Sequence, residues 1–289
     1  MRDQGTATLH RPHAVVAHEG WHARLALQFA RVGSRTVLAR REHVGPLVVQ
    51  KPLYPEAESV CQCIVVHPPA GIAGGDRIEL DVAAKAGTHV QLTTPGAAKW
   101  YRSAGARAAQ RICFRIGADA VLEWLPQGTI VFDEADATSE LVVHLEGDGA
   151  FIGWDVVCLG RTASSEQFTA GRWRQRVDIE RDGALIWSER MALAGNSPWL
   201  GSPPGLNGAP VFGTFVAVSA TFDDSTLHAC RALVPAQGDG AVTRLPGAFV
   251  GRYRGPSSEP AHAYFTALWR VVRPHVTGRE AIIPRIWRT

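Results

Sequence analysis

The sequence is poor in charged residues and has no cluster of one sign. Charged residues make up 20% of the 289 positions, and the formal net charge is only +3. Proteins that bind nucleic acid usually carry a concentrated basic surface, whereas the arginines here are scattered along the chain. The composition therefore argues against a nucleic-acid partner.

Cysteine is scarce, and long hydrophobic runs are missing. The five cysteines are an odd number and, apart from Cys61 and Cys63, lie far apart, which argues against a secreted disulfide framework and favours a reducing compartment. No segment reaches the roughly 18 uninterrupted apolar residues of a membrane helix. The first residues, MRDQGTATLHRPHAVV, lack the apolar core of a signal peptide. We therefore expect a cytoplasmic protein with no membrane contact.

Three common nucleotide-binding or catalytic motifs are also missing. The glycine-rich stretch HPPAGIAGGDRIEL, residues 67–80, matches neither G-x-G-x-x-G nor the phosphate loop, because no Lys-Ser or Lys-Thr follows the glycines. The segment GNSPWLG does not match the G-x-S-x-G nucleophile elbow. We predict instead that residues 67–80 form a corner between two strands, where glycines shape the turn and Asp76 accepts hydrogen bonds from turn amides.

Strand pattern is what the sequence has in abundance. WHARLALQF, residues 21–29, alternates apolar and polar residues with a period of two, as in a half-buried strand. Similar short runs recur along the chain, separated by glycine and proline turns at fairly regular spacing. Residues 259–274, EPAHAYFTALWRVVRP, instead predict an amphipathic helix that ends before Pro274. Residues 150–160 fit either a short helix or a buried strand.

Residues 195–210, GNSPWLGSPPGLNGAP, read as a long loop because glycine, proline, asparagine and serine dominate them. The strand-rich pattern is similar on both sides of this loop, although a domain boundary here is the alternative. We therefore expect one domain over residues 1–289, with a loop-rich insertion near 195–210.

Two segments resemble metal sites. HEGWH, residues 18–22, matches the zinc-protease motif H-E-x-x-H, and a zinc-dependent hydrolase is therefore the alternative function. That motif needs a helix, because in a strand the two histidines would lie roughly 13 Å apart. Cys61, Cys63 and His67 form C-x-C-x3-H, although no fourth ligand with compact spacing is visible. Small buried cysteines are the commoner explanation for this pair.

A further alternative function is a β-rich module that binds a small ligand and uses the nine tryptophans as stacking surfaces. The spread of the tryptophans along the strands fits packing in the core better.

Six longer blocks occur in an order and spacing that resemble one family over nearly the whole chain. They are HVGPLVVQKPLYPE, HPPAGIAGGDRIEL, LTTPGAAKWYRS, LEWLPQGTIVFD, GWDVVCLGR and the terminal LWRVVRPHVTGREAIIPRIWRT. Together they are similar to the urease accessory protein UreD, called UreH in some organisms. Trp100 stands where the family more often has phenylalanine, and residues 195–210 and 223–243 resemble the family least.

The resemblance implies a non-enzymatic role in urease maturation. Members of the family bind the urease apoprotein, recruit the accessory protein UreF and the GTPase UreG, and assist nickel delivery to the urease active site. The expected partners are therefore the urease structural subunits, UreF and UreG. No tightly bound cofactor is expected, only nickel in transit. The family fold implies a mainly β protein, a single elongated domain of helically wound, layered β-sheets with about two α-helices.

The resemblance also implies an internal passage for nickel, lined here by Asp76, Asp155 and Glu189, with His67 as a further candidate. Single carboxylates suit a transient role, because a closed thiolate or multi-histidine cage would trap the ion. Each residue has a simpler alternative. Asp76 would only cap its turn, Asp155 would pair with an arginine, and Glu189 would form a cross-strand ion pair. His67 would only hold the corner closed.

Two further groups are candidates for partner contact. Lys99, Trp100 and Arg102 either face a partner or cover the core. Arg285 and Trp287 belong to residue types that are enriched at interface hot spots, and the alternative is that this tail docks on its own sheet near the amphipathic helix.

Overall fold

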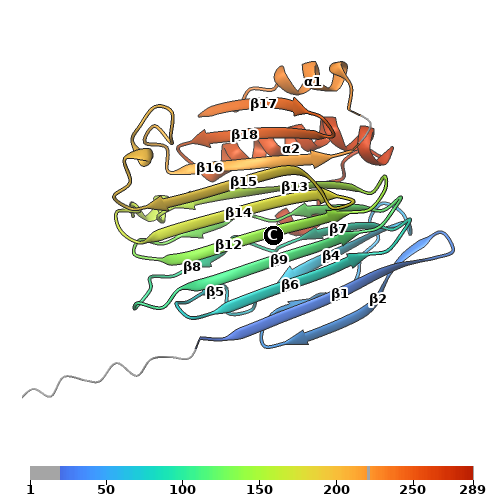
Figure 1. The fold of residues 1–289 in the computed structure, drawn as a ribbon, viewed down its shortest axis with the longest axis horizontal. Coiled ribbons are helices and arrows are strands. Elements are labelled where there is room, and N and C mark those ends of the chain that lie inside the picture. Colours follow the sequence, from blue (N-terminus) through green and yellow to red (C-terminus); the bar gives the residue numbers. More distant parts are fainter. Residues whose placement is uncertain (1–19, 220–221, 289) are drawn as a thin grey trace, which may run out of the picture.

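The protein is a β-solenoid of about four turns with two α-helices, as a computed structural model that describes residues 20–219 and 222–288 shows (Figure 1). The strands form two large sheets that face each other, and the chain passes repeatedly from one sheet to the other. This arrangement confirms the expected mainly β fold of helically wound, layered sheets.

The first sheet has seven strands in the order β15-β14-β12-β9-β6-β1-β2. Its strands are β1 (His22–Val32), β2 (Arg35–Val44), β6 (Arg77–Ala84), β9 (Ala108–Ile116), β12 (Asp136–Leu145), β14 (Arg172–Arg181) and β15 (Ala184–Ala194). The five inner strands run parallel to one another, and β2 and β15 pair antiparallel at the two edges.

The second sheet has eleven strands, eight of which follow the order β17-β18-β16-β13-β10-β7-β4-β3. These eight are β3 (Val48–Val49), β4 (Val60–Val66), β7 (His89–Thr93), β10 (Val121–Leu125), β13 (Ala150–Leu159), β16 (Val211–Val218), β17 (Asp239–Leu245) and β18 (Ala248–Gly255). Three short strands, β5 (Gly71–Ile72), β8 (Ala98–Trp100) and β11 (Thr129–Val131), stack beside them.

A solenoid coil contains one strand of the second sheet, one short strand and one strand of the first sheet. Successive coils are β4-β5-β6, β7-β8-β9 and β10-β11-β12, and β13 and β14 form the next. Because neighbouring coils pair in parallel, inward residues stack in rows across the sheet. One such row joins Leu25, Leu80, Ile112, Leu141 and Val177. The period-two pattern of the sequence thus becomes the core between the sheets.

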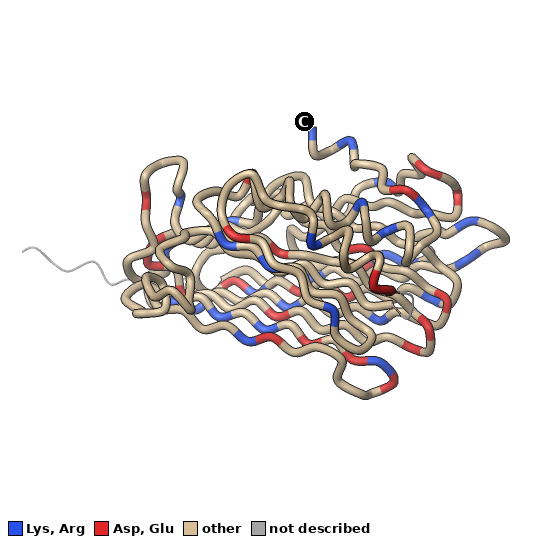
Figure 2. The backbone as a smooth tube through the Cα atoms, turned by 90° about the horizontal axis from the view of Figure 1, so that it is seen from above, with Lys and Arg blue, Asp and Glu red and all other residues tan. Residues whose placement is uncertain are grey.

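The outward face of the first sheet carries charges of alternating sign. A row in register joins Arg24, Glu79, Arg111, Glu140 and Arg176, and Figure 2 shows positive and negative positions interspersed along the strands. Opposite charges on neighbouring strands stabilise a sheet modestly.

Helix α2 (Ser258–Thr277) covers the outer face of the second sheet and contacts β13, β16 and β18. The shorter helix α1 (Asp224–Arg231) packs against α2 and β17. The expected amphipathic helix is confirmed, but the prediction that it ends before Pro274 is wrong. The last turn continues past the proline because Thr277 Oγ1 donates to the Arg273 carbonyl (3.0 Å) and Gly278 N–H to the Pro274 carbonyl (2.8 Å).

The structure also decides the conformation of residues 150–160 and of the 195–210 segment. Residues 150–160 form strand β13 rather than a helix, and residues 195–210 form the loop that joins β15 to β16, with the 3₁₀ turn η2 (Pro198–Leu200) inside it. Two further 3₁₀ turns are η1 (Thr162–Ser164) and η3 (Arg285–Arg288). In the part of the chain that the structure describes, no helix is long and apolar enough to cross a membrane.

Only part of the HEGWH segment lies within the described residues. His18 and Glu19 fall outside them, whereas His22 begins strand β1 and places its Nε2 atom 3.4 Å from Glu79 Oε1. The strand expected from Trp21 onward is confirmed as β1, His22–Val32. The described end of this motif is therefore extended, not helical.

Candidate functional site

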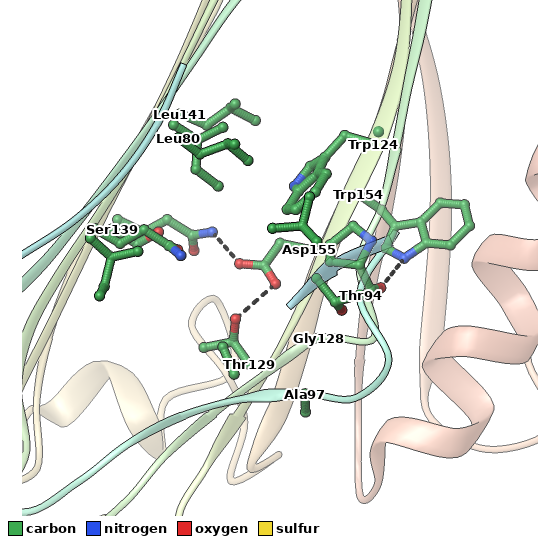
Figure 3. Close-up of a pocket in the computed structure, with 18 of the residues that line it drawn as sticks. Leu80, Thr94, Ala97, Trp124, Gly128, Thr129, Ser139, Leu141, Trp154 and Asp155 are labelled. Atoms are coloured by element: carbon green, nitrogen blue, oxygen red, sulfur yellow. Dashed lines mark hydrogen bonds between the residues drawn. The ribbon is translucent and has the colours of Figure 1, made fainter. Parts of the chain in front are cut away.

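The main candidate site is a partly open pocket of about 430 Å³ between the two sheets, which we call the inner cavity (Figure 3). Residues from every coil contribute to its wall, from His67 before β5 to Glu189 on β15. Adjacent strands lie about 4.8 Å apart, so the four steps from β6 to β15 span about 19 Å. The cavity therefore extends along the axis of the solenoid.

A row of polar side chains breaks the apolar interior of the first sheet. Gln110 on β9 and Gln175 on β14 flank Ser139 on β12 in register, and all three residues line the inner cavity. The row beside it is apolar. Because burying polar groups without partners is unfavourable, three polar residues at equivalent positions of successive coils mark one side of the cavity as a hydrophilic track.

Asp155, on β13 in the opposite sheet, faces this track. Its carboxylate accepts hydrogen bonds from Gln175 Nε2 (3.0 Å) and from Thr129 Oγ1 (3.1 Å) (Figure 3). Burial raises the pKa of Asp155 to about 6, although these hydrogen bonds and the Val156 N–H oppose the rise. The side-chain donors to this carboxylate are an amide and a hydroxyl, not the arginine of the simpler alternative.

Glu189, on the edge strand β15, lies at one end of the inner cavity. Its Oε1 atom accepts from Arg252 Nη1 (2.6 Å) on β18 and from Thr214 Oγ1 (3.3 Å) on β16. Its Oε2 atom is buried and has no hydrogen-bond partner among the described residues. The ion pair thus joins strands of the two sheets, and it matches the cross-strand ion pair of the simpler alternative.

His67 lies at the other end of the inner cavity. Its Nε2 atom is buried and lacks a hydrogen-bond partner among the described residues. Burial lowers the pKa of His67, and the nearby Asp76 charge only partly offsets this effect, so the neutral imidazole is favoured. A neutral imidazole nitrogen without a partner has the chemistry of a metal ligand.

Asp76 holds the corner instead of lining the inner cavity. It is 7% exposed, and its two oxygens accept from the backbone N–H groups of Trp21 (2.7 Å) and Ala73 (2.8 Å). Gly75, at φ +95°, supplies the left-handed turn beside it. The predicted strand-to-strand corner is confirmed, and the contacts of Asp76 match its simpler alternative as a turn residue.

The residues expected near the third block are dispersed. Lys99 lines the inner cavity, whereas Trp100 is only 1% exposed and packs edge-on against Trp173, with ring centroids 5.4 Å apart. Arg102 is exposed and forms an ion pair with Glu134 (3.3 Å). Trp100 therefore lies in the core, and Arg102 is the member of this group on the surface.

The C-terminal tail lies against the second sheet. Trp287 Nε1 donates to Thr93 Oγ1 (2.8 Å), and its ring packs on Trp154 and Trp269 with centroid distances of 5.8 and 6.1 Å. Arg285 is exposed. The ring of Trp287 thus serves the chain's own packing, as the docking alternative anticipates, and Arg285 is accessible to a partner.

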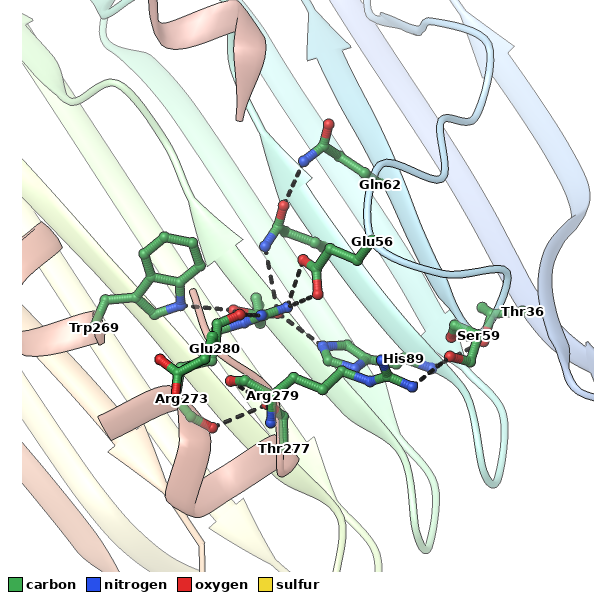
Figure 4. A network of polar contacts seen from close by, with 12 residues as sticks. Thr36, Glu56, Ser59, Gln62, His89, Trp269, Arg273, Thr277, Arg279 and Glu280 are labelled. Atoms are coloured by element: carbon green, nitrogen blue, oxygen red, sulfur yellow. Dashed lines mark hydrogen bonds and ion pairs between the residues drawn. The ribbon is translucent and has the colours of Figure 1, made fainter. Parts of the chain in front are cut away.

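The sequence reading missed a buried polar network beneath α2 (Figure 4). Arg273 is fully buried, and its guanidinium lies 3.0 Å from Glu123 and 2.7 Å from Glu56. Burial opposes ionisation, but His89 and Arg273 outweigh it and lower the pKa of Glu123 to about 2. Trp269 Nε1 completes the network by donating to Glu123 (2.7 Å). The available signal was an arginine four positions after Trp269 on the apolar face of a helix.

The potential metal ligands are spread out, not gathered. Within residues 20–219 and 222–288, no three His, Cys, Asp or Glu side chains could hold one metal ion. Cys61 and Cys63 are buried in β4 and contact each other, and no described cluster joins them with His67. The inner cavity therefore offers single, separated ligands.

These features define a class of protein: a β-solenoid whose coils enclose a cavity with isolated polar groups. Comparison with known proteins identifies the family. A family model described as UreD urease accessory protein matches residues 22–288. The chain belongs to the UreD urease accessory protein family, whose members are non-catalytic maturation factors. That membership argues against the zinc-hydrolase alternative.

Individual relatives cover nearly the full chain. The urease accessory protein UreD of Azoarcus sp. (strain BH72) is 51% identical over 275 residues, which are 94% of this chain and 96% of that protein. UreD of Dechloromonas aromatica (strain RCB) is 51% identical over 273 residues, 93% and 95% of the two chains. UreD of Methylobacillus flagellatus is 43% identical over 291 residues and covers 100% of both.

Proposed function

We propose that this chain is a scaffold for urease maturation whose inner cavity conducts nickel in transit. In this role it binds the urease apoprotein and the accessory protein UreF, and it reaches the GTPase UreG through UreF. One observation carries the proposal: the inner cavity extends along the solenoid axis and has a polar row on one side, with His67, Asp155 and Glu189 spaced along its wall.

The spacing of the ligands suits transfer better than storage. A carboxylate, a hydroxyl or an amide oxygen binds a divalent cation weakly when it acts alone, so the ion exchanges readily to the next group. Gln110, Ser139 and Gln175 supply such oxygens at successive coils, and Asp155 supplies negative charge beside them. A cation in the cavity would favour ionised Asp155, because an opposite charge stabilises the carboxylate.

We also propose that residues 1–289 form a single domain that works in the cytoplasm. The inter-sheet core receives side chains from both halves of the chain, and the 195–210 loop connects a strand of each sheet. The five cysteines are free and buried, which suits a reducing compartment. Exposed Arg102 and Arg285 are our candidates for partner contact, with Lys99 at the cavity wall.

Co-expression with urease tests both parts of this function. The wild-type chain is expected to co-purify with the urease structural subunits and UreF. Asp155→Ala is expected to keep these associations but to lower the nickel content of urease at limiting nickel. Asp178→Asn, a change on the outer face of the first sheet, is the matched control and is expected to leave nickel content unchanged.

The two parts fail separately. If the folded wild-type chain associates with neither urease nor UreF, the scaffold role is wrong. If association persists but Asp155→Ala leaves nickel incorporation at the wild-type level, the cavity is not the route.

A further inference from the structure

A second cavity of about 610 Å³ lies outside the solenoid end, between β15, the 195–210 loop and strands β16, β17 and β18; we call it the outer cavity. Thr214 lines both cavities. Glu189 lines the inner cavity, and its ion-pair partner Arg252 lines the outer one. The Glu189–Arg252 pair therefore stands at the boundary between them.

We propose that the Glu189–Arg252 ion pair is a gate between the two cavities, and that an acidic segment of a partner protein opens it by binding Arg252. This inference rests on the proposed nickel passage. To that passage it adds an exit at the boundary between the two cavities, with Arg252 as the residue that closes the exit and an acidic partner segment as the group that opens it.

The guanidinium of Arg252 competes with a metal cation for the same ligands. Its Nη1 atom lies 2.6 Å from Glu189 Oε1 and 3.3 Å from Thr214 Oγ1. A divalent cation that leaves the inner cavity at this end meets a fixed positive charge while Arg252 is in place. Glu189 Oε2, buried and without a hydrogen-bond partner among the described residues, has free lone pairs for an arriving cation once that charge is removed.

Arg252 is the member of the pair that can move. Its side chain is 48% exposed, whereas that of Glu189 is 13% exposed. Because the carboxylate of Glu189 is mostly buried, this pair is worth more than the about 0–1 kcal/mol of a fully exposed ion pair, so a competing anion is needed to draw the guanidinium away. The carboxylate stays at the cavity wall while the guanidinium turns toward the outer cavity.

The charge of the outer cavity indicates what would draw Arg252 away. Three arginines line it, Arg190, Arg252 and Arg254, against Asp239, which already pairs with Arg254 at 2.8 Å. Arg190 is exposed. A carboxylate can accept two parallel hydrogen bonds from one guanidinium group, so an acidic segment complements this surface. Trp199, 56% exposed at the same cavity, offers an apolar face beside the charges.

Release of nickel from the purified full-length chain tests the gate. The protein is loaded with Ni²⁺ alone, mixed rapidly with a chelating dye, and the release rate is recorded. Arg252→Ala is expected to speed release at least about tenfold, equivalent to about 1.4 kcal/mol. Arg252→Lys retains a cation and is expected to stay closer to wild type. Arg190→Ala, which removes a charge from the same cavity without touching Glu189, is expected to change the rate less than about twofold.

A hexaglutamate peptide tests the opening step, with acetate at equal carboxylate concentration as the control. The peptide is expected to speed release from wild type but not from Arg252→Ala, and acetate is expected to have much less effect. If the peptide accelerates release equally from wild type and from Arg252→Ala, the proposed opening by an acidic segment that binds Arg252 is wrong.

The outcomes separate the gate from the passage. Wild-type protein that holds nickel, together with an unchanged release rate in Arg252→Ala, refutes the gate and leaves the passage standing. If wild type binds no more nickel than a variant that lacks both Asp155 and Glu189 carboxylates, the passage itself fails, and the gate with it.

Discussion

Replacing Asp155 by asparagine is expected to stabilise the protein at neutral pH while impairing nickel transfer. The side chain keeps its size and loses its charge. Asp155 accepts hydrogen bonds from the neutral side chains of Gln175 and Thr129, and no ion pair joins it to a cationic side chain among the described residues. Burial therefore makes its ionised form unfavourable when no cation is bound, and the asparagine amide removes that penalty.

The expected gain in the free energy of unfolding follows from the pKa of Asp155. Burial raises the pKa of Asp155 from 3.8 to about 6, which corresponds to about 3 kcal/mol at 1.36 kcal/mol for each tenfold change in the ionisation constant. Because the folded-state pKa is the higher one, the stability conferred by the neutral carboxyl is present at low pH and is lost as pH rises through about 6. About 1.4 kcal/mol of that loss falls between pH 5 and pH 8. Weaker hydrogen bonding by the amide offsets roughly 1 kcal/mol.

Urea denaturation of wild type and Asp155→Asn at several pH values measures this effect. The free energy of unfolding of the variant is expected to exceed that of wild type by about 2 kcal/mol at pH 8, and by clearly less at pH 5. Asp178→Asn is the control with opposite sign, because hydrogen bonds and charges from Ser188 and Arg176 outweigh burial and lower the pKa of Asp178. A difference between Asp155→Asn and wild type that is constant from pH 5 to pH 8 would refute the reasoning.

Three further substitutions test other parts of the structure. Gln110→Leu is expected to keep the free energy of unfolding within about 1.5 kcal/mol of wild type but to lower urease nickel content at limiting nickel; unchanged nickel content would contradict a role for the polar row. Arg273→Ala should lower the free energy of unfolding by about 3–5 kcal/mol, because it leaves two buried carboxylates without their cation. The control Arg279→Ala should change the free energy of unfolding by less than about 1 kcal/mol. If urea denaturation gives similar losses for the two variants, the buried network does not stabilise the fold. Trp287→Ala should lower the melting temperature by several degrees, for a loss of about 1–3 kcal/mol, and loss of UreF in co-purification at unchanged melting temperature would instead favour partner contact.

Local patterns predicted much of the fold. The alternation in residues 21–29 identified β1, because a strand with one buried face repeats every two residues. The apolar stripe of residues 259–274 identified α2, and only its end was misplaced, because contacts of Thr277 and Gly278 extend the helix beyond Pro274. The coil repeat was not visible, because the turns between equivalent strands differ in length and sequence.

The candidate site was predictable only in part. Sequence resemblance selected Asp155 and Glu189, and His67 was a further candidate; all three line the inner cavity. It selected Asp76 equally, which instead accepts hydrogen bonds from two backbone N–H groups in the corner. It did not select Gln110, Ser139 and Gln175, because their common property is register between parallel strands, and three isolated polar residues have no local signature.

The sequence by itself determined the strand-rich class, the main amphipathic helix, the corner at residues 67–80 and the family, because each depends on local periodicity or on contiguous residues. The tertiary structure alone decided which polar groups share the inner cavity and that Glu189 pairs with Arg252, 63 residues further along the chain. Such contacts depend on how coils stack and how the two sheets face each other, and backbone hydrogen bonding and core packing of the whole solenoid set both.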